Sequence, residues 1–322
     1  MSNQPRVLVT RLIPEAGLEQ VRQACEVTVW AEDMPAPYER LLDLVKGMDG
    51  LLCTLTERID AGLMDAAGPQ LKVISQMAVG YDNIDVAAAR TRGIPIGNTP
   101  GVLTDATADI AMALLLAVSR RIVESVDYIR TGQWQTWQPT ALLGTDLAGA
   151  TLGLIGLGRI GKAVARRARG FDLRLIAHSP HCPPEEAHAL GVELVELDYL
   201  LSEADYVSIH TPLNERTRHL INRKTLAQMK PSAILINTAR GGVVDQHALY
   251  EALQAGKLRG AGLDVTDPEP IPLDDPLLGL PNVVILPHIG SASQRTRDRM
   301  AMMAADNLIA GVTGQPLPTQ VK

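Results

Sequence analysis

The chain has 322 residues, enough for two domains, because a single hydrophobic core stops growing at about 250–300 residues. Its 46% hydrophobic and 20% charged residues are typical of a globular protein, and a net charge of −6 without a basic cluster argues against a nucleic-acid partner. The longest apolar run, Ile110–Val118, is too short for a membrane span, and the N-terminus lacks the pattern of a signal peptide. Three cysteines without metal-ligand spacing favour a reducing compartment, so we expect a cytoplasmic protein without metal, membrane or nucleic-acid partners.

Short β-rich runs and helical patterns alternate through the N-terminal third of the chain. The expected strands are Arg6–Thr10, Val27–Trp30, Gly50–Cys53, Lys72–Ser75 and Ile94–Gly97. The expected helices are Pro14–Ala24, Tyr38–Lys46, Asp60–Ala67 and Val86–Arg92. Gly93, followed by Pro95, is a helix stop signal. This alternation predicts βαβ units and a parallel sheet.

A long helical pattern follows from Leu103 to Arg120, and its interior is apolar nearly all round. Such a helix must be buried, and we expect it between two domains. The irregular segment after it contains Trp134 and Trp137. Because an irregular extension of this kind is hard to stabilise alone, it predicts a homodimer.

The glycines of residues 151–161 predict a dinucleotide-binding turn. An apolar run ends in Gly156, Gly158 and Gly161, spaced G-x-G-x-x-G, and a helical pattern and a second strand follow. In such a turn the first glycine allows the tight bend, the second lets the backbone approach a pyrophosphate, and the third lets the helix pack on the strand. The helix then presents free N–H groups to the phosphates. The alternative is a glycine-rich turn that binds no ligand.

The second α/β block begins at this turn, and a last helix is expected from Ser291 to Val312. We predict a dinucleotide-binding domain over residues 100–289 and a discontinuous substrate domain over residues 1–99 and 290–322, each a doubly wound parallel sheet. The expected strands are Thr151–Ile155, Arg174–Ala177, Tyr206–His210, Ala233–Asn237, Gly260–Asp264 and Val283–Leu286.

Three charged residues, Arg240, Glu269 and His288, come just after expected strands of this block. In open α/β sheets ligands bind outside the carboxyl ends of the strands. The sequence therefore predicts a site built from these side chains.

Several motifs resemble the D-isomer-specific 2-hydroxyacid dehydrogenases, over nearly the whole chain. Residues 101–109 and 288–292 look most like the glyoxylate/hydroxypyruvate reductases of that family. The resemblance implies a Rossmann nucleotide domain and a flavodoxin-like substrate domain, with hydride transfer from NAD(P)H to a small 2-keto acid. The other motifs that carry it are Val79–Asp85, Asn98–Gly101, Gly156–Gly161, Asn237–Gly242, Gly262–Val265 and Pro287–Ser291.

The resemblance also implies the catalytic roles. Arg240 would bind the substrate carboxylate and the C2 oxygen, for which its planar fork is suited. His288 would protonate the C2 oxygen, and Glu269 would pair with His288 and favour the imidazolium. The alternatives are a surface salt-bridge arginine, a structural histidine that caps a turn, and a glutamate on an exposed turn.

Substrate-binding roles fall on both blocks. Val79 and Gly80 would offer backbone N–H groups to the carboxylate, unless they form an ordinary strand-to-helix turn. Ser291 would touch the substrate or cap the last helix. Trp137 would reach into the active site of a neighbouring subunit or cover an irregular arm. The side-chain pocket is expected near Leu55, Met77 and Trp137.

Cofactor-binding roles include two with alternatives. Asp264 would bind the nicotinamide carboxamide or cap a helix, and Thr107 would face the phosphates or bond within its own helix. Arg240, His288 and the glycine turn are shared with this set. The other expected contacts are Leu157, Arg159, Ile160, His178, Ser179, Pro180, His210, Thr211, Pro212, Thr217, Thr238, Ala239 and Gly290.

Ser179 stands where NAD-specific folds place an acid for the ribose 2′-hydroxyl. Nothing there repels a 2′-phosphate, so the sequence favours NADP(H) and leaves NAD(H) open. Glyoxylate reductases that prefer NADP usually have an arginine just after this serine, and here Pro180 takes its place.

Other functions of the family stay open. Lactate-type or phosphite dehydrogenation would use the same machinery, whereas Glu269 argues against formate dehydrogenation, which pairs the histidine with glutamine. A nucleotide-sensing scaffold would bind cofactor without turnover, and the presence of a proton donor argues against it.

Overall fold

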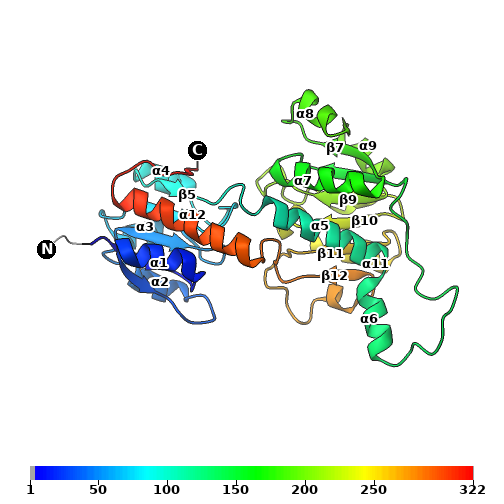
Figure 1. Ribbon diagram of the computed structural model, residues 1–322, viewed down its shortest axis with the longest axis horizontal. Coiled ribbons are helices and arrows are strands. Elements are labelled where there is room, and N and C mark those ends of the chain that lie inside the picture. Colours follow the sequence, from blue (N-terminus) through cyan, green and yellow to red (C-terminus); the bar gives the residue numbers. More distant parts are fainter. Residues whose placement is uncertain (1–3, 322) are drawn as a thin grey trace. The chain divides into compact units, whose positions relative to one another are not determined.

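The computed structural model describes residues 4–321 and divides the chain into two units, residues 1–103 with 292–322 (unit 1) and residues 104–291 (unit 2) (Figure 1). Each unit is built around one sheet in which all strands are parallel. The predicted α/β class with two parallel sheets is confirmed. Among residues 4–321, no helix is both long and apolar enough to cross a membrane.

Unit 1 holds a five-stranded sheet with the order β2-β1-β3-β4-β5, which is the flavodoxin-like order. Its strands are β1 (Arg6–Val9), β2 (Glu26–Val29), β3 (Gly50–Cys53), β4 (Val73–Gln76) and β5 (Ile96–Gly97). Its helices are α1 (Glu15–Ala24), α2 (Tyr38–Leu44), α3 (Ala61–Ala67), α4 (Val86–Thr91) and α12 (Gln294–Val312).

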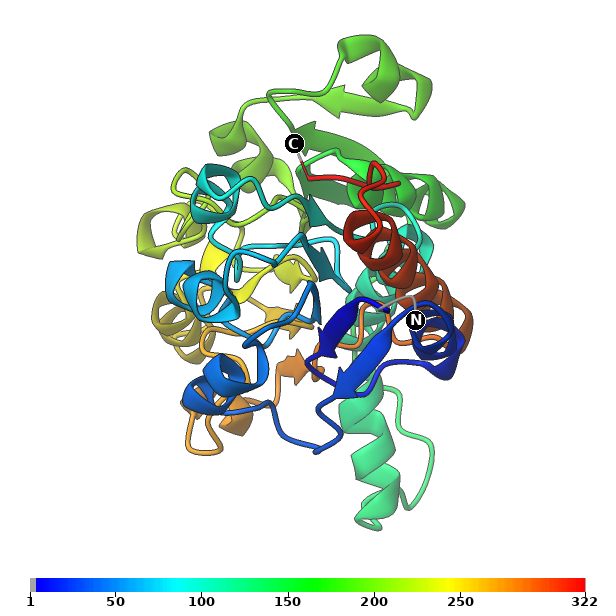
Figure 2. The same cartoon turned by 90° about the vertical axis from the view of Figure 1, so that its left-hand side faces the viewer.

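Helices cover both faces of this sheet. Leu8, Leu51 and Ile74 pack against α2, α3 and α4 on one face. On the other face α12 packs on β3 and β4 and lies alongside α1, as both views show (Figures 1 and 2). The C-terminal helix thus returns to the first block, as its apolar pattern requires.

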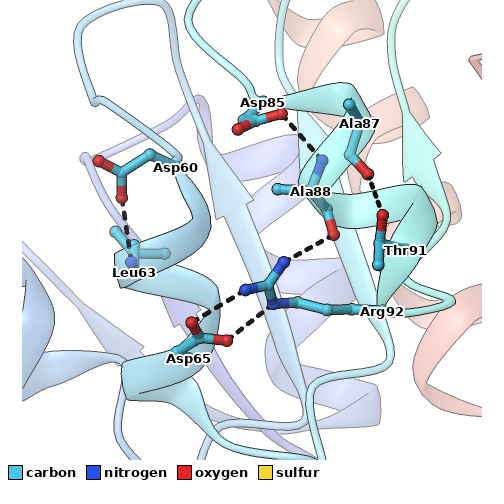
Figure 3. Close-up of polar contacts among 8 residues, drawn as sticks. All are labelled: Asp60, Leu63, Asp65, Asp85, Ala87, Ala88, Thr91 and Arg92. Atoms are coloured by element: carbon cyan, nitrogen blue, oxygen red, sulfur yellow. Dashed lines mark hydrogen bonds and ion pairs between the residues drawn. The ribbon is translucent and has the colours of Figure 1, made fainter.

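Carboxylates fix the starts of α3 and α4 (Figure 3). The Asp60 side chain accepts a hydrogen bond from Leu63 N at 3.1 Å, and Asp85 accepts from Ala88 N at 2.9 Å. These bonds satisfy N–H groups that have no partner within the helix. Between the two helices, Arg92 donates two hydrogen bonds to Asp65, at 2.7 and 2.9 Å. The α4 helix ends just before Gly93, whose φ of +67° confirms the predicted stop.

Unit 2 holds a seven-stranded sheet with the order β12-β11-β10-β9-β6-β7-β8. From β6 the chain adds β7 and β8 toward one edge of the sheet, and from β9 it adds β10, β11 and β12 toward the other edge. The position between β6 and β9 is therefore the topological switch point of a Rossmann sheet. Its strands are β6 (Thr151–Ile155), β7 (Arg174–His178), β8 (Val192–Leu194), β9 (Tyr206–Ile209), β10 (Ile234–Asn237), β11 (Gly260–Leu263) and β12 (Val283–Ile285). Its α-helices are α5 (Thr104–Ser119), α6 (Ile122–Arg130), α7 (Arg159–Ala168), α8 (Pro184–Ala189), α9 (Leu197–Glu203), α10 (Arg223–Leu226) and α11 (Gln246–Gln254).

The long helix α5 differs from its prediction. It packs on α7, β10 and β11, but Asp105 and Asp109 on its outer side are exposed. Both carboxylates pair with Arg167 of α7, at 3.1 and 2.6 Å. The helix therefore has one exposed polar side, where Asp105 and Asp109 form ion pairs with α7. The apolar pattern of the sequence alone did not reveal these pairs.

The last helix also begins later than predicted. It starts at Gln294, with Ser293 at the N-cap position. The alternative that Ser291 caps this helix is therefore wrong, and Ser291 lies half-buried in the segment before it.

Candidate active site

Apart from Thr107 and Trp137, which come before the first strand of unit 2, the predicted site residues of this unit lie at or after the carboxyl ends of its strands. Because the strands are parallel, these ends share one edge of the sheet, and the sheet order brings the segments after β6, β9, β10, β11 and β12 side by side. These segments, with the one after β7, hold Gly156–Gly161, His178–Pro180, His210–Pro212, Thr238–Arg240, Asp264 and His288–Gly290.

Two glycines of the turn after β6 are required by the protein itself. Gly156 has φ +96°, and a Cβ there would lie 2.8 Å from His210 O. A Cβ on Gly161 would lie 2.2 Å from Gly156 O. Either contact is closer than packed atoms tolerate, so these positions set the bend and the approach of α7 to the strand.

Gly158 is different, because nothing in the protein requires it. Its φ of −76° is open to any residue, and a Cβ there would meet no atom within 4 Å. A glycine that neither backbone nor packing demands, at the start of α7, fits the close approach of a phosphate group.

Two buried polar atoms near this turn lack a protein partner. His210 Nδ1, after β9, and Thr238 Oγ1, after β10, have no hydrogen bond within the described chain. Buried polar groups are nearly always hydrogen-bonded, so such atoms at the strand ends fit contacts to a ligand. Together with Gly158 they show that this edge suits a dinucleotide.

His210, which is half-buried and whose Nδ1 is inaccessible to solvent, predicts an acid-sensitive stability. Burial lowers the pKa of His210 to about 4 from 6.5, because desolvation disfavours the imidazolium. As pH falls from 6.5 to about 4, His210 takes up a proton in the unfolded chain but stays neutral in the folded chain. The free energy of unfolding should therefore fall by about 3 kcal/mol as pH drops from above 6.5 to 4. Denaturant titrations should give a smaller loss for His210→Asn, while the exposed His181→Asn should behave like the unaltered protein.

The proposed acid and its partner are in contact. His288 Nδ1 and Glu269 Oε1 lie 2.5 Å apart. The pair is partly exposed, with 27% and 39% of the two side chains accessible. An ionised carboxylate on Nδ1 fixes that nitrogen as a donor and leaves Nε2 to exchange a proton with another group.

Asp264 holds the backbone that carries His288. Its two carboxylate oxygens accept hydrogen bonds from Ile289 N and Gly290 N, each at 2.7 Å, and its carbonyl accepts from His288 N at 3.0 Å. His288 has φ +52°, a left-handed conformation that a non-glycine residue adopts only when its surroundings enforce it. Asp264 is 1% exposed, and desolvation raises its pKa.

The helix-cap alternative for Asp264 is wrong, because no helix begins between residues 265 and 275 of the described chain. A carboxylate offers about four acceptor sites, so bonds to two N–H groups leave it able to accept another donor.

Arg240 is tied to the loop that carries Glu269. A Cβ on the following Gly241 would lie 1.9 Å from Thr266 O, so only glycine permits this approach. The Arg240 carbonyl accepts from Asn237 Nδ2 at 2.9 Å, and its guanidinium donates to Ala239 O at 2.8 Å. The segments after β10 and β11 therefore pack backbone to backbone beside the acid pair.

The segment after β7 is hydrogen-bonded to the glycine turn. Ser179 Oγ accepts a hydrogen bond from Leu157 N at 3.0 Å, which leaves its own proton for donation. His178 Nδ1 lies 3.2 Å from Val195 O and thus donates to it. Pro180 directly follows Ser179, and Arg159 and Ile160 are the first two residues of α7.

Three further predicted site residues differ in their burial and contacts. Thr107 of α5 is buried beside Gly290, where a Cβ would lie 3.5 Å from the Thr107 hydroxyl. Thr217 Oγ1 donates to Pro212 O at 2.6 Å and so stabilises its own loop after Thr211. Trp137 is 78% exposed.

In unit 1 the predicted residues gather after β3 and β4. Met77 N donates to Cys53 O at 2.8 Å, which joins the segments that hold Leu55 and Met77. Met77 is buried, and Leu55, Val79 and Gly80 are half-buried. These four residues therefore lie at the carboxyl edge of the unit 1 sheet.

Sequence reasoning missed polar residues that organise these loops. Gln246 Oε1 accepts from Asp267 N at 3.0 Å, near Glu269, and Glu57, buried in unit 1, accepts from Thr10 Oγ1 and Thr54 N at 2.9 and 2.7 Å. A third such residue is Asn98, whose Nδ2 donates to Val79 O, and it is the only one of the three that lies in a motif noted in the sequence. Within residues 4–321, no group of three or more His, Cys, Asp or Glu side chains could hold a metal ion.

The turn permits a direct test. Gly158→Ala should change the free energy of unfolding by about 1 kcal/mol or less, since alanine is only a poorer N-cap, yet weaken binding of NADPH by at least tenfold. Gly161→Ala should instead cost about 1–3 kcal/mol or more, from overpacking against Gly156 O. Thermal unfolding and fluorescence titration separate the two effects. Unchanged NADPH affinity in Gly158→Ala would contradict the site.

Known proteins similar to this chain share its length. The family described as D-isomer specific 2-hydroxyacid dehydrogenase, NAD binding domain, matches residues 112–290. A glyoxylate reductase of Korarchaeum cryptofilum is 52% identical over 318 residues, 98% of this chain and 96% of the relative. The human glyoxylate reductase/hydroxypyruvate reductase is 45% identical over 320 residues, 98% of each chain. The structure of an NADPH-dependent glyoxylate/hydroxypyruvate reductase from Sinorhizobium meliloti, in complex with NADP and malonate, is 35% identical with a TM-score of 0.87, covering 99% of this chain and 97% of that one.

Proposed function

The chain belongs to the D-isomer-specific 2-hydroxyacid dehydrogenases, and from this premise we propose that it reduces glyoxylate or hydroxypyruvate to the 2-hydroxy acid. It is an NAD(P)-dependent glyoxylate/hydroxypyruvate reductase, and the relatives that match 98% of its length are named glyoxylate reductase and glyoxylate reductase/hydroxypyruvate reductase. When bound at the glycine turn Gly156–Gly161, NAD(P)H would supply the hydride that the C2 carbon receives.

The residues of this chain divide the remaining work. Arg240 binds the carboxylate and the C2 oxygen through its planar fork, and the Val79 and Gly80 N–H groups add donors for the carboxylate. His288 gives its Nε2 proton to the C2 oxygen as the C2–O double bond becomes a single bond. Glu269 keeps that imidazole oriented and stabilises its charged form.

The contact between His288 and Glu269 is the observation that carries this proposal. A carboxylate 2.5 Å from Nδ1 and an enforced left-handed backbone at His288 form a rigid proton donor. A protein that only bound the nucleotide would not need one.

A spectrophotometric assay tests the function: oxidation of NADPH and NADH is followed with glyoxylate, hydroxypyruvate and pyruvate as separate additions, and reduction of NADP+ and NAD+ is followed with phosphite. We expect turnover with the first two to exceed that with pyruvate. Cofactor binding without turnover on any of them would indicate a nucleotide-sensing scaffold and contradict the proposal. Faster turnover with pyruvate would instead indicate a lactate-type enzyme.

The cofactor preference proposed is for NADP(H). Residues 178–184, at and after the end of β7, include no Asp or Glu, and the Ser179 hydroxyl keeps a proton that a 2′-phosphate could accept. Pro180 in place of an arginine weakens this selection and leaves NAD(H) usable. In the same assay, kcat/KM for NADPH should exceed that for NADH, and the reverse order would overturn the preference. The three free cysteines lead us to place the enzyme in the cytoplasm.

We also propose a homodimer built on α6 and the irregular segment after it, which extend away from the seven-stranded sheet (Figures 1 and 2). Exposed apolar side chains gather there, more than a monomer usually leaves in water. They are Ile122, Val123, Val126 and Ile129 of α6, with Trp134, Trp137 and Leu143.

Light scattering should therefore give about twice the chain mass of 34.6 kDa. The variant Val126→Asp with Ile129→Asp should shift the protein to the single-chain mass, because a charge would be buried at the interface. A single-chain mass for the unaltered protein at micromolar concentration would refute the dimer.

A further inference from the structure

We propose that Asn98 is a positioning residue that sets the direction of the Gly80 N–H group toward the substrate carboxylate. The inference rests on the proposed function, which gives the Val79 and Gly80 N–H groups to that carboxylate. It concerns contacts within unit 1 alone.

The side-chain amide of Asn98 fixes one peptide plane. Asn98 Nδ2 donates to Val79 O at 2.9 Å. Because the peptide that joins Val79 to Gly80 is planar and trans, the Gly80 N–H points opposite to that carbonyl. A bond that holds the Val79 carbonyl on the side of Asn98 therefore holds the Gly80 N–H on the opposite side.

The preceding peptide is fixed in the same way by the backbone. Thr99 N donates to Ala78 O at 2.9 Å, so the Val79 N–H also points away from the segment 98–99. Within residues 4–321, neither the Val79 N–H nor the Gly80 N–H has a hydrogen-bond partner. Two adjacent donors with fixed directions and no protein acceptor suit the two oxygens of a carboxylate.

Asn98 can act in this way because its own backbone is anchored. Its carbonyl accepts from Thr319 Oγ1 at 2.7 Å and from Asn307 Nδ2 at 3.1 Å, and its N–H donates to Thr319 O at 3.1 Å. Asn307 lies on α12 and is fully buried. Asn98 is itself only 9% exposed. The C-terminal segment and α12 thus form the fixed support from which the amide reaches Val79.

A second amide acts one peptide further on. Gln76 Nε2 donates to Gly80 O at 3.2 Å, and Gln76 Oε1 accepts from Cys53 Sγ at 3.0 Å. This bond orients the Tyr81 N–H rather than that of Gly80. The role assigned to Asn98 is therefore not shared by Gln76.

The variants Asn98→Ala and Asn98→Asp test the proposal. Both remove the donor to Val79 O, and the carboxylate of the second would repel that carbonyl. We expect KM for glyoxylate and Ki for oxamate, an unreactive carboxylate analogue, to rise about tenfold, the effect of one lost hydrogen bond to a charged group. KM for NADPH should stay the same, and kcat should change less than about threefold.

The matched control is Thr319→Val, which removes the hydroxyl bonds to Asn98 O and Asn307 but keeps the bond from Asn98 Nδ2 to Val79 O. Because Asn98 O still accepts from Asn307 Nδ2 and Asn98 N still donates to Thr319 O, the Asn98 backbone stays anchored, and KM for glyoxylate should equal that of the unaltered enzyme. A rise as large as in Asn98→Ala would show that packing of the segment, not the amide, matters, and would overturn the proposal. So would unchanged KM and Ki in either folded Asn98 variant. Absence of keto-acid turnover in the unaltered protein would instead refute the proposed function, and this inference with it.

Discussion

The variant His288→Gln should lower kcat for glyoxylate reduction by about 10²–10⁴-fold, the usual contribution of a positioned proton donor. Glutamine can keep a hydrogen bond to Glu269, so the loop and its left-handed backbone should persist, but the side chain has no proton to give at neutral pH. The affinity for NADPH should change little, because the glycine turn and the buried groups after β9 and β10 are untouched.

Steady-state kinetics and a fluorescence titration with NADPH separate these quantities. The chain offers a matched control in His247, an exposed histidine of α11 that also pairs with a glutamate, Glu251, at 3.4 Å. His247→Gln should leave kcat unchanged. A loss of less than about threefold in His288→Gln would mean that another group, or water, delivers the proton.

The variant Arg240→Lys should lower kcat/KM for glyoxylate by about 10²-fold while the positive charge is retained. A lysine ammonium is a point charge and cannot make the paired bonds of a guanidinium to a carboxylate. The loss of one charge-assisted hydrogen bond, about 1.5–3 kcal/mol, corresponds to roughly 10- to 150-fold. Most of the change should appear as a higher KM for the keto acid, with KM for NADPH nearly constant.

Arg174→Lys is the corresponding control, because Arg174 is half-exposed and pairs with Glu193 at 2.9 Å on β7 and β8. It should leave kcat/KM unchanged. A normal KM for glyoxylate in Arg240→Lys would remove the basis for carboxylate binding by Arg240.

The sequence predicts the parallel sheets well because their strands are buried on both faces and stand out as continuous apolar runs. The strands Gly50–Cys53 and Thr151–Ile155 have the predicted bounds. The edge strand Val192–Leu194 was missed, since only its first residue is buried. The helix Ile122–Arg130 was missed as well. Its apolar residues Ile122, Val126 and Ile129 do recur at helical spacing, but the helix is separated from α5 only by Arg120 and Arg121, and the left-handed backbone of Arg121 breaks the helical run without a glycine or proline to mark the break.

For the candidate site, sequence patterns predict which residues follow strand ends but not which atoms meet. The bonds from Ile289 and Gly290 to Asp264 join residues 25 and 26 apart, and no local pattern encodes them. The bond from Asn98 to Val79 likewise depends on how two loops pack. The difference between Gly158 and its neighbours also needs coordinates, because it depends on what surrounds a missing Cβ.

The single backbone contact at Gly241 has a consequence for redesign of this enzyme. A methyl group at that position would push apart the segments that carry Arg240 and Glu269, so the proposed binding of the carboxylate and the proposed proton transfer should both be impaired. Libraries that aim at bulkier keto acids should therefore vary Leu55 and Met77 and keep residue 241 constant. Variants selected in this way should accept other keto acids, while the segments that carry Arg240 and Glu269 keep their present packing.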